Sequence, residues 1–556
     1  MSRKALAGIA LLLTTIVAAP ANAADPPAPA WQGFYFGGHV GGALTRTTFS
    51  DPDNLDGIFG GNVASPGFLA GLQLGYNWRV APKWLVGVEA EGSILSSQGH
   101  NTCLQSSITF VGSDCKTLPR EMASFTGRVG YLADPDSRLL VYGKAGLAWM
   151  RSQVEIDPNN LSAFDRFPLT GDPLVEGAPT NQMVSAWGWT IGAGIEYALT
   201  PRWSLDAGYQ YMRFNLGMVP TPETVDVSAA GNVTGVPGGG ASSVSQDVHV
   251  ARVGLNYHFG SPGKAADSYG TPSSAEVPWT PGWEFEGGAR YWYSSGSLTS
   301  ANGSQMGLVS RLPYNHLEGH SGELFARLDA PFNTFIKGFV GLGGIVNGTM
   351  YDEDWALPNT LAAEPSGYEI TQSGVNGTMN YLTIDMGYDV LRGRDHKVGL
   401  FVGYNRYHTV LNTLGCEQLV SPGSGVCYPT IPSNVNAITE TDTWHSLRLG
   451  VAADVELARR LKLGIDLAYL PYVRVESLDE HKLRSLNFPT NGTGNGVQGE
   501  ILLSYALTDA FNLGVGGRYW SMWTANGYLT DSSSYVMLET QRYGVFVQGS
   551  YKFGTP

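Results

Sequence analysis

The sequence predicts an all-β protein made of two antiparallel transmembrane β-barrels, the first of about eight strands and the second of about ten. Three observations support this fold class. The chain begins with an export signal, its later segments alternate apolar and polar residues, and short turns alternate along it with long polar segments. This combination is typical of barrels in the outer membrane of Gram-negative bacteria.

The first residues predict a secretory signal peptide over residues 1–23. Arg3 and Lys4 precede an apolar run over 5–19, and residues 21–23 form a small-x-small cleavage site. A membrane anchor is the alternative, but the run is shorter than the roughly 20 residues that a membrane helix needs, and Pro20 follows it. No later stretch approaches that length, so the exported chain is either soluble or a β-barrel.

Composition favours the barrel. Gly accounts for 72 of the 556 residues and aromatic residues for 11%, whereas charged residues make up only 15%. Ordinary soluble domains contain about 25% charged residues. The net charge of −14 argues against a nucleic-acid partner.

Period-two alternation is the main secondary-structure signal. Within 203–211 the odd positions are apolar and the even ones polar or small, and 511–520 follow the same pattern. Lipid outside and a wet or charged lumen inside require this arrangement. A soluble β-sandwich also alternates, but its turns would be short at both ends.

Residues 24–260 are predicted to form the first barrel. Its strands are expected near 33–45, 67–80, 83–97, 122–133, 138–150, 184–198, 202–214 and 247–259. Short turns such as 81–83 alternate with long external loops expected at 46–66, 98–121, 151–183 and 215–246. Side chains fill the lumen of an eight-stranded barrel, so a pore is not expected.

Residues 261–282, rich in Pro, Ser, Gly and Ala, are expected to form a linker. The second barrel is predicted over 283–556. Its strands are expected near 283–294, 322–331, 334–347, 380–391, 397–409, 443–456, 461–473, 496–507, 511–523 and 541–553, and its long loops at 295–321, 348–379, 410–442, 474–495 and 524–540.

Both strand series end alike, with Asn-Tyr-His-Phe-Gly at 256–260 and Ser-Tyr-Lys-Phe-Gly at 550–554. An aromatic-rich final strand that occurs twice favours two closed barrels. A single larger barrel is the alternative, but it would carry a Pro-rich segment between adjacent strands, which edge pairing tolerates poorly.

The four cysteines form two close pairs, Cys103 with Cys115 and Cys416 with Cys427. Paired cysteines in an exported chain indicate disulfides, here expected within external loops. A metal site is disfavoured, because neither a Cys-x-x-Cys motif nor clustered His accompanies them.

Residues 24–42, which read ADPPAPAWQGFYFGGHVGG, resemble the mature start of the small outer-membrane barrel family of alphaproteobacteria. Members of that family are eight-stranded surface proteins. The resemblance covers about 24–260 and implies a surface or envelope-organising role without catalysis.

The second half resembles the omptins, which are ten-stranded outer-membrane endopeptidases. The resemblance rests on residues 348–355 (GTMYDEDW) and 476–481 (ESLDEH), with weaker support from 288–293 (GARYWY). The family's Asp-x-Asp-Trp motif matches Asp352 and Asp354, and its Asp-Glu-His motif matches Asp479 and His481. The resemblance implies that these four residues are catalytic, with water as the nucleophile between the two pairs.

The same four residues can be interpreted without the family. In an extended segment, residues two apart share a face, so Asp352 and Asp354 would point together, as would Asp479 and His481. A neutral His481 could take a proton from an attacking water while Asp479 orients the imidazole. The two carboxylates of the first pair would share a proton, which should raise one pKa. Solvated loop acids and a divalent-metal site are the alternatives.

One departure from the family concerns specificity. Omptins that cut beside basic residues carry an acid two positions before the dyad Asp, where this chain has Ser477, and another acid in the first external loop, where 297–305 contain none. Altered or relaxed specificity is therefore expected. No cofactor is expected. The expected partners are a peptide or protein substrate, outer-membrane lipid, and lipopolysaccharide, which the resemblance implies as an activator. A non-catalytic surface protein, such as an adhesin or an envelope tether, is the alternative.

Overall fold

The computed structural model describes residues 31–50, 61–106, 111–134, 137–157, 179–221, 224–227, 233–236, 241–260, 281–304, 307–355, 368–420, 427, 429–529 and 535–554. The predicted signal peptide and nearly all of the predicted linker lie outside these residues. Within the described part of the chain, no helix is long and apolar enough to cross a membrane.

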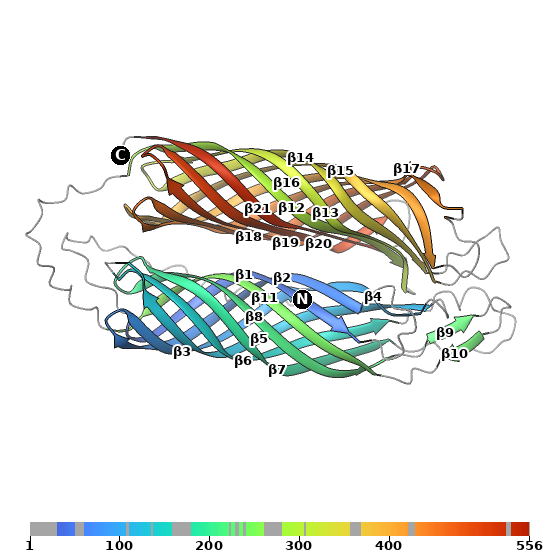
Figure 1. Cartoon of the computed structure of the whole chain (residues 1–556), viewed down its shortest axis with the longest axis horizontal. Coiled ribbons are helices and arrows are strands. Elements are labelled where there is room, and N and C mark those ends of the chain that lie inside the picture. Colours follow the sequence, from blue (N-terminus) through green and yellow to red (C-terminus); the bar gives the residue numbers. More distant parts are fainter. Residues whose placement is uncertain are drawn as a thin grey trace, which may run out of the picture.

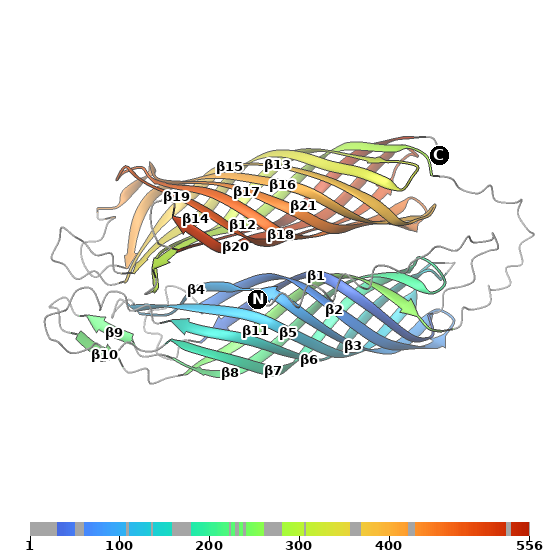
Figure 2. The same ribbon diagram turned by 180° about the vertical axis from the view of Figure 1, so that it is seen from behind.

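Two β-barrels lie side by side (Figures 1 and 2). The first closes in the order β1-β2-β3-β5-β6-β7-β8-β11, because β11 pairs with β1 and β3 pairs with β5. Two further hairpin elements project from this ring: β4 pairs with the first part of β5, and β9 pairs with β10. The strands are β1 (Gly33–Phe49), β2 (Gly61–Ala81), β3 (Trp84–Ser97), β4 (Gly99–Ser106), β5 (Val111–Leu132), β6 (Leu139–Asp157), β7 (Thr180–Ala198), β8 (Trp203–Pro220), β9 (Thr224–Val227), β10 (Val233–Val236) and β11 (Ala241–His258).

The second barrel closes from β12 to β21 in sequence order, and every neighbouring pair is antiparallel. Its strands are β12 (Glu284–Ser304), β13 (Gly307–Asp329), β14 (Thr334–Trp355), β15 (Tyr368–Arg392), β16 (His396–Val420), β17 (Ile431–Ala458), β18 (Leu461–His481), β19 (Leu486–Ala506), β20 (Phe511–Leu529) and β21 (Tyr535–Gly554). The predicted fold class, two antiparallel barrels of about eight and ten strands, is thus confirmed.

The strands are longer than predicted at one end of each barrel. The short turns fall where they were expected, but much of the predicted external loops is strand. The loop expected at 98–121 contains β4 and half of β5, and that expected at 474–495 contains the end of β18 and the start of β19, joined by a tight turn at 482–485. A membrane-spanning strand needs about 9–11 residues, whereas β14 has 22. Each barrel therefore extends well beyond the bilayer on its external side.

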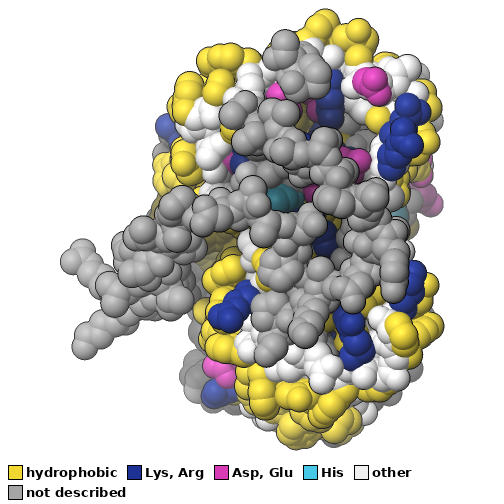
Figure 3. Space-filling model, turned by 90° about the vertical axis from the view of Figure 1, so that its left-hand side faces the viewer, with side chains coloured by type: hydrophobic (Ala, Val, Ile, Leu, Met, Phe, Trp, Pro, Cys, Tyr) yellow, Lys and Arg dark blue, Asp and Glu magenta, His cyan; other side chains and the backbone are white. Residues whose placement is uncertain are grey.

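The outer walls are apolar and the lumens are filled. Leu72, Phe125 and Trp187 of the first barrel and Leu342 and Val515 of the second are exposed. Figure 3 shows hydrophobic side chains along the outer margins of both barrels. This is the outward apolar face that lipid requires.

Ion pairs fill the lumen of the first barrel. Arg128 lies 2.8 Å from Glu196, and Lys144 lies 2.9 Å from Glu89 and 2.8 Å from Glu91. All five side chains are buried. Each charge has an opposite charge beside it, as burial in a narrow lumen demands.

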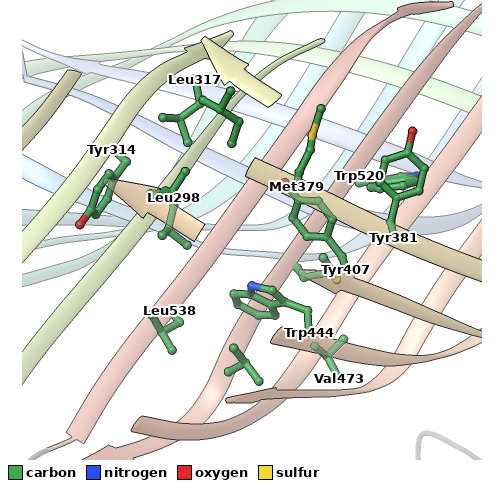
Figure 4. Packing of buried hydrophobic residues seen from close by; sticks show 14 of the residues in the cluster. Leu298, Tyr314, Leu317, Met379, Tyr381, Tyr407, Trp444, Val473, Trp520 and Leu538 are labelled. Carbon is green, nitrogen blue, oxygen red and sulfur yellow. The ribbon is translucent and has the colours of Figure 1, made fainter. Parts of the chain in front are cut away.

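The second barrel contains an aromatic layer across its middle. Trp520 packs against Trp292, Tyr381 and Tyr407, with ring centroids 5.1–5.8 Å apart. Figure 4 shows Trp520 beside Tyr381. Arg518 adds a cation above the Trp292 ring, and its Nη1 lies 2.8 Å from Glu323. These side chains close the lumen below the external rim.

The structure joins Cys103 to Cys115 and Cys416 to Cys427 through disulfides. The first bond lies between β4 and β5, not in the irregular loop that the sequence suggested. Cys416 lies within β16, so this pair also differs from the expected loop position.

Candidate active site

The four predicted site residues lie on strands that rise above the lipid-facing zone. Asp352 and Asp354 are near the external end of β14, and Asp479 and His481 end β18. The last large exposed apolar side chain is Val346 on β14 and Tyr472 on β18. The prediction that these residues lie in long loops was wrong, because strand pairing continues outside the membrane through the site. Asp352 pairs in register with Thr371 and Asp479 with Glu440.

Strand geometry turns Asp352 and Asp354 together and Glu353 away from them. The pKa values of Asp352 and Asp354 respond to the charges of Asp479 and His481. Glu353, in contrast, is fully buried against Arg311 and Thr102. The alternation of side chains along a strand accounts for this division.

His481 and Asp479 form a hydrogen-bonded dyad. Nε2 of His481 lies 3.0 Å from Oδ2 of Asp479, and Arg484 donates from Nη2 to Nδ1 of His481 over 2.6 Å. Because Nδ1 accepts this bond, the network assigns the proton to Nε2, which donates to Asp479. Nδ1 is therefore the basic nitrogen. Arg484 reaches it from the exposed turn between β18 and β19.

The carboxyls of the first pair titrate above their usual range. Burial, together with the negative charges of Asp354 and Asp479, raises the pKa of Asp352 well above its usual value. Burial and the charge of Glu369 raise the pKa of Asp354 to about 6, against the lowering effects of a hydrogen bond from Ser310 and of the charges of Arg484 and His481. The sequence predicted one raised pKa from like-charge repulsion. Both are raised, and burial is the larger cause.

The electrostatic effect of each pair on the other indicates that the two pairs lie in one site. Asp479 raises the pKa of Asp352, and His481 lowers that of Asp354. The energy between two charges falls with distance, so groups that shift one another's pKa lie near one another. The two motifs, 127 residues apart from Asp352 to Asp479, thus meet at the same rim.

Sequence reasoning missed two acids beside the dyad. Glu440 and Asp442 of β17 pair in register with Asp479 and Ser477, and Oγ of Ser477 donates to Oε1 of Glu440 over 2.6 Å. Burial, the charge of Asp442 and that of Asp479 raise the pKa of Glu440 well above its usual value. Burial raises the pKa of Asp442 to about 7, although hydrogen bonds lower it.

These acids occupy the region where the sequence suggested that acids are lacking. The comparison with omptins considered only Ser477 and the first external loop, whereas the acids stand on the neighbouring strand. Among the described residues, no Lys or Arg lies within ion-pair distance of Glu440 or Asp442. The only available signal was the Glu-Thr-Asp spacing at 440–442, which puts both acids on one face.

Tyr314 of β13 lies among the carboxyl groups. Burial raises its pKa, as do the charges of Glu440, Asp479, Asp442 and Asp352. Its ring is fully buried, and its hydroxyl has no hydrogen-bond partner within the described part of the chain. In Figure 4 the hydroxyl points away from the other labelled side chains. Nothing in the sequence marked this tyrosine, because residues 295–321 were expected to form an external loop, whereas the structure places Tyr314 within β13.

The described residues contain no group of three or more His, Cys, Asp or Glu side chains placed to hold a metal ion. One histidine and several carboxyl groups give the site the means for acid–base chemistry.

Two family models match two different parts of the chain. A family model described as "Outer membrane protein beta-barrel domain" matches residues 9–259, and one described as "Omptin family" matches 333–536. The 31 kDa outer-membrane immunogenic protein of Brucella melitensis is 29% identical over 263 residues, which cover 45% of this chain and 96% of that protein. The 22 kDa outer membrane protein of Rhizobium leguminosarum is 28% identical over 190 residues, 33% of this chain and 65% of that protein.

Among solved structures, the outer membrane protease OmpT of Escherichia coli aligns with 50% of this chain and 100% of its own, at 16% identity and a TM-score of 0.40. The two family matches confirm both resemblances drawn from the sequence. They also confirm an outer-membrane location in a Gram-negative bacterium. All four predicted site residues fall inside the segment that the Omptin model matches.

Proposed function

We propose that the second barrel is a cell-surface endopeptidase that hydrolyses peptide bonds with an activated water. The observation that carries this proposal is the meeting of Asp352 and Asp354 with the His481–Asp479 dyad at one buried, acidic rim. The match to the Omptin family model supports it. No nucleophilic Ser or Cys is required, because water can attack directly.

His481 acts as the general base. Its Nδ1 takes a proton from water as the water oxygen bonds to the carbonyl carbon of the peptide. Asp479 accepts the hydrogen bond from Nε2 and stabilises the imidazolium that forms. Collapse of the tetrahedral intermediate breaks the C–N bond, and the leaving amine takes up a proton. This step regenerates the neutral imidazole when His481 is the donor.

Asp352 and Asp354 hold the attacking water from the opposite side. Their raised pKa values mean that the pair retains a proton near neutral pH. A half-protonated carboxyl pair can accept one hydrogen bond from the water and donate another to the developing oxyanion. Burial strengthens both interactions, because little bulk solvent competes with them.

Arg484 occupies a position at the rim that a cationic side chain of the substrate would take. Its guanidinium caps Nδ1 of His481, so it must move before a water can reach this nitrogen. Glu440 and Asp442 lie beside the dyad, and a Lys or Arg side chain of the substrate would satisfy their charges. We therefore propose that the enzyme prefers to cut beside basic residues. Glu440 and Asp442 would provide this preference in place of the acids at the two positions compared with the omptins. Lipopolysaccharide remains a proposed activator.

The test uses the full chain refolded with lipopolysaccharide and a mixed peptide library analysed by mass spectrometry. Cleavage should be enriched beside Lys and Arg. His481→Ala should lower the rate by about 10²–10⁴-fold, the usual contribution of a general base. His445→Ala is the matched control, because His445 bonds to Tyr404 on the outer wall, away from the site.

Two results would contradict the proposal. Products that persist at wild-type rates in His481→Ala would exclude the assigned base. Absence of cleavage over the whole library, with both barrels folded, would favour the alternative of a non-catalytic surface protein.

A further inference from the structure

The β4–β5 hairpin of the first barrel reaches the outer wall of the second barrel. β4 lies outside the eight-stranded ring and pairs only with the beginning of β5 in the described structure. In Figures 1 and 2 it is located at the external end of the first barrel, on the side that faces the second. A small cavity lined by His100 and Lys116 of the hairpin and by Trp523 and Glu539 of β20 and β21 lies between them.

A chain of buried polar contacts joins this hairpin to β13 and β14. Oγ1 of Thr102 donates to Oε1 of Glu353 over 2.7 Å. Arg311 donates from Nε to Oε2 of Glu353 over 2.6 Å and from Nη1 to Oδ1 of Asp114 over 2.7 Å. Thr102, Glu353 and Arg311 are each at most 1% exposed.

The charges in this chain alternate across the interface. The Arg311 guanidinium lies between Glu353 of its own barrel and Asp114 of the first barrel. His100 stands 3.6 Å from the same Asp114 oxygen. Buried ions are stable only when geometry and hydrogen bonds are good, so this arrangement fixes the relative position of the strands that carry them.

The hairpin is a rigid unit at the point of contact. Thr102 and Asp114 are direct partners in the β4–β5 ladder, and each is followed in sequence by a cysteine of the Cys103–Cys115 disulfide. The covalent bond therefore links the two strands directly beside Thr102 and Asp114, which both contact the second barrel.

The contact falls on the back of the candidate site. Glu353 stands between Asp352 and Asp354 on β14 and faces the other way, and Arg311 is its partner on β13. The next pair in the register joins Ser310 to Asp354. Holding Glu353 and Arg311 thus restrains the backbone from which both site carboxyls project.

We propose that the first barrel is a positioning element for the candidate active site, acting through Thr102 and Asp114 on the Glu353–Arg311 pair. This inference gives the non-catalytic barrel a role within the proposed protease, and its catalytic consequence rests on the proposed function. We call the contact of Thr102 and Asp114 with the Glu353–Arg311 pair the clamp. Its presence can be tested without measuring activity.

The test compares full-length wild type with Asp114→Asn and Thr102→Val, both made in the first barrel only. Arg138→Gln is the control, since it removes the ion pair with Asp395 (2.7 Å) that joins the barrels at the other, short-turn end. Hydrogen exchange by mass spectrometry follows residues 350–355, with 334–345 as the internal reference. Peptide cleavage gives kcat and KM separately.

Exchange over 350–355 should become at least tenfold faster in both variants, with no change over 334–345 and none in the control. In the same variants kcat should fall at least tenfold while KM stays within twofold, as expected for misplaced catalytic groups. The fall in kcat of the double variant Asp114→Asn/Arg311→Gln should be no larger than that of Arg311→Gln alone.

Unchanged exchange over 350–355 in both variants would overturn the clamp, whatever the activity. Faster exchange in a protein whose wild type cleaves nothing would retain the clamp and overturn the proposed protease function. Faster exchange with unchanged kcat would overturn the positioning role.

Discussion

Replacing Asp354 by Asn should stabilise the folded protein at neutral pH while it removes activity. Burial and the charge of Glu369 raise the pKa of Asp354 from 3.8 to about 6. The folded state therefore binds this proton more tightly than the unfolded state does. The contribution of Asp354 to stability is therefore fully present below pH 3.8 and is lost as the pH rises through about 6, because ionising this carboxyl is costlier in the folded protein.

The magnitude follows from the two values. A gap between 3.8 and about 6 corresponds to about 3 kcal/mol at neutral pH, since each pKa unit represents about 1.4 kcal/mol. Asp354 is only partly buried, and solvent screens part of its interactions. The neutral amide of Asn should therefore increase the free energy of unfolding by about 1–2 kcal/mol at pH 7.5, and by close to zero at pH 4.

Urea unfolding of the refolded protein in lipid or detergent, followed by tryptophan fluorescence at both pH values, measures this difference. Asp509→Asn, in the exposed turn before β20, is the matched control and should change stability by less than about 0.5 kcal/mol. If Asp354→Asn were less stable than wild type at pH 7.5, the carboxylate would be stabilised by its surroundings, and the reasoning would be refuted.

Three other predictions concern the same rim. Glu440→Gln should reduce kcat/KM for peptides with Lys or Arg at the cleavage site by about 10–100-fold relative to peptides with neutral residues, since a charge-assisted bond contributes about 1.5–3 kcal/mol; equal losses on both peptide classes would contradict this. Arg484→Ala should move the acid limb of the pH–activity profile to higher pH, because its positive charge lowers the pKa of both carboxyls of the first pair; an unmoved limb would argue against that interaction. Joint replacement of Cys416 and Cys427 by Ser should lower the free energy of unfolding by about 3 kcal/mol, the loop-closure value for a separation of 11 residues, as measured by urea unfolding under non-reducing conditions.

Much of the fold could be predicted because the lipid-facing strands obey one simple rule. Apolar and polar residues alternate in the membrane, so the positions and the number of strands follow from period two and from short turns such as 330–333. The rule fails above the membrane, where both faces of a strand meet water or other protein. This is why the outer halves of β5, β14 and β18 were interpreted as loops.

The site could be predicted only in part for a related reason. Asp352, Asp354, Asp479 and His481 lie in short local motifs, so the resemblance to the omptin motifs could identify them. Glu440 and Tyr314 join the site through cross-strand register and through the closure of the barrel, which no local pattern encodes. The contact from Asp114 to Arg311 spans 197 residues and was likewise invisible.

Buried charges are paired in the lumens of the two barrels, whereas acids gather without basic partners among the described residues at the rim of the second barrel. This contrast supports the proposed function. Inside the lumens, Arg128 is paired with Glu196 and Arg518 with Glu323, as stability requires. At the rim, Asp442 lies with other acids beside Asp479 and has no basic partner within ion-pair distance among the described residues. Placing several acids together at the rim without cations lowers the stability of the folded protein. Such a local cost is expected where a ligand, in our proposal a cationic peptide, completes the interactions.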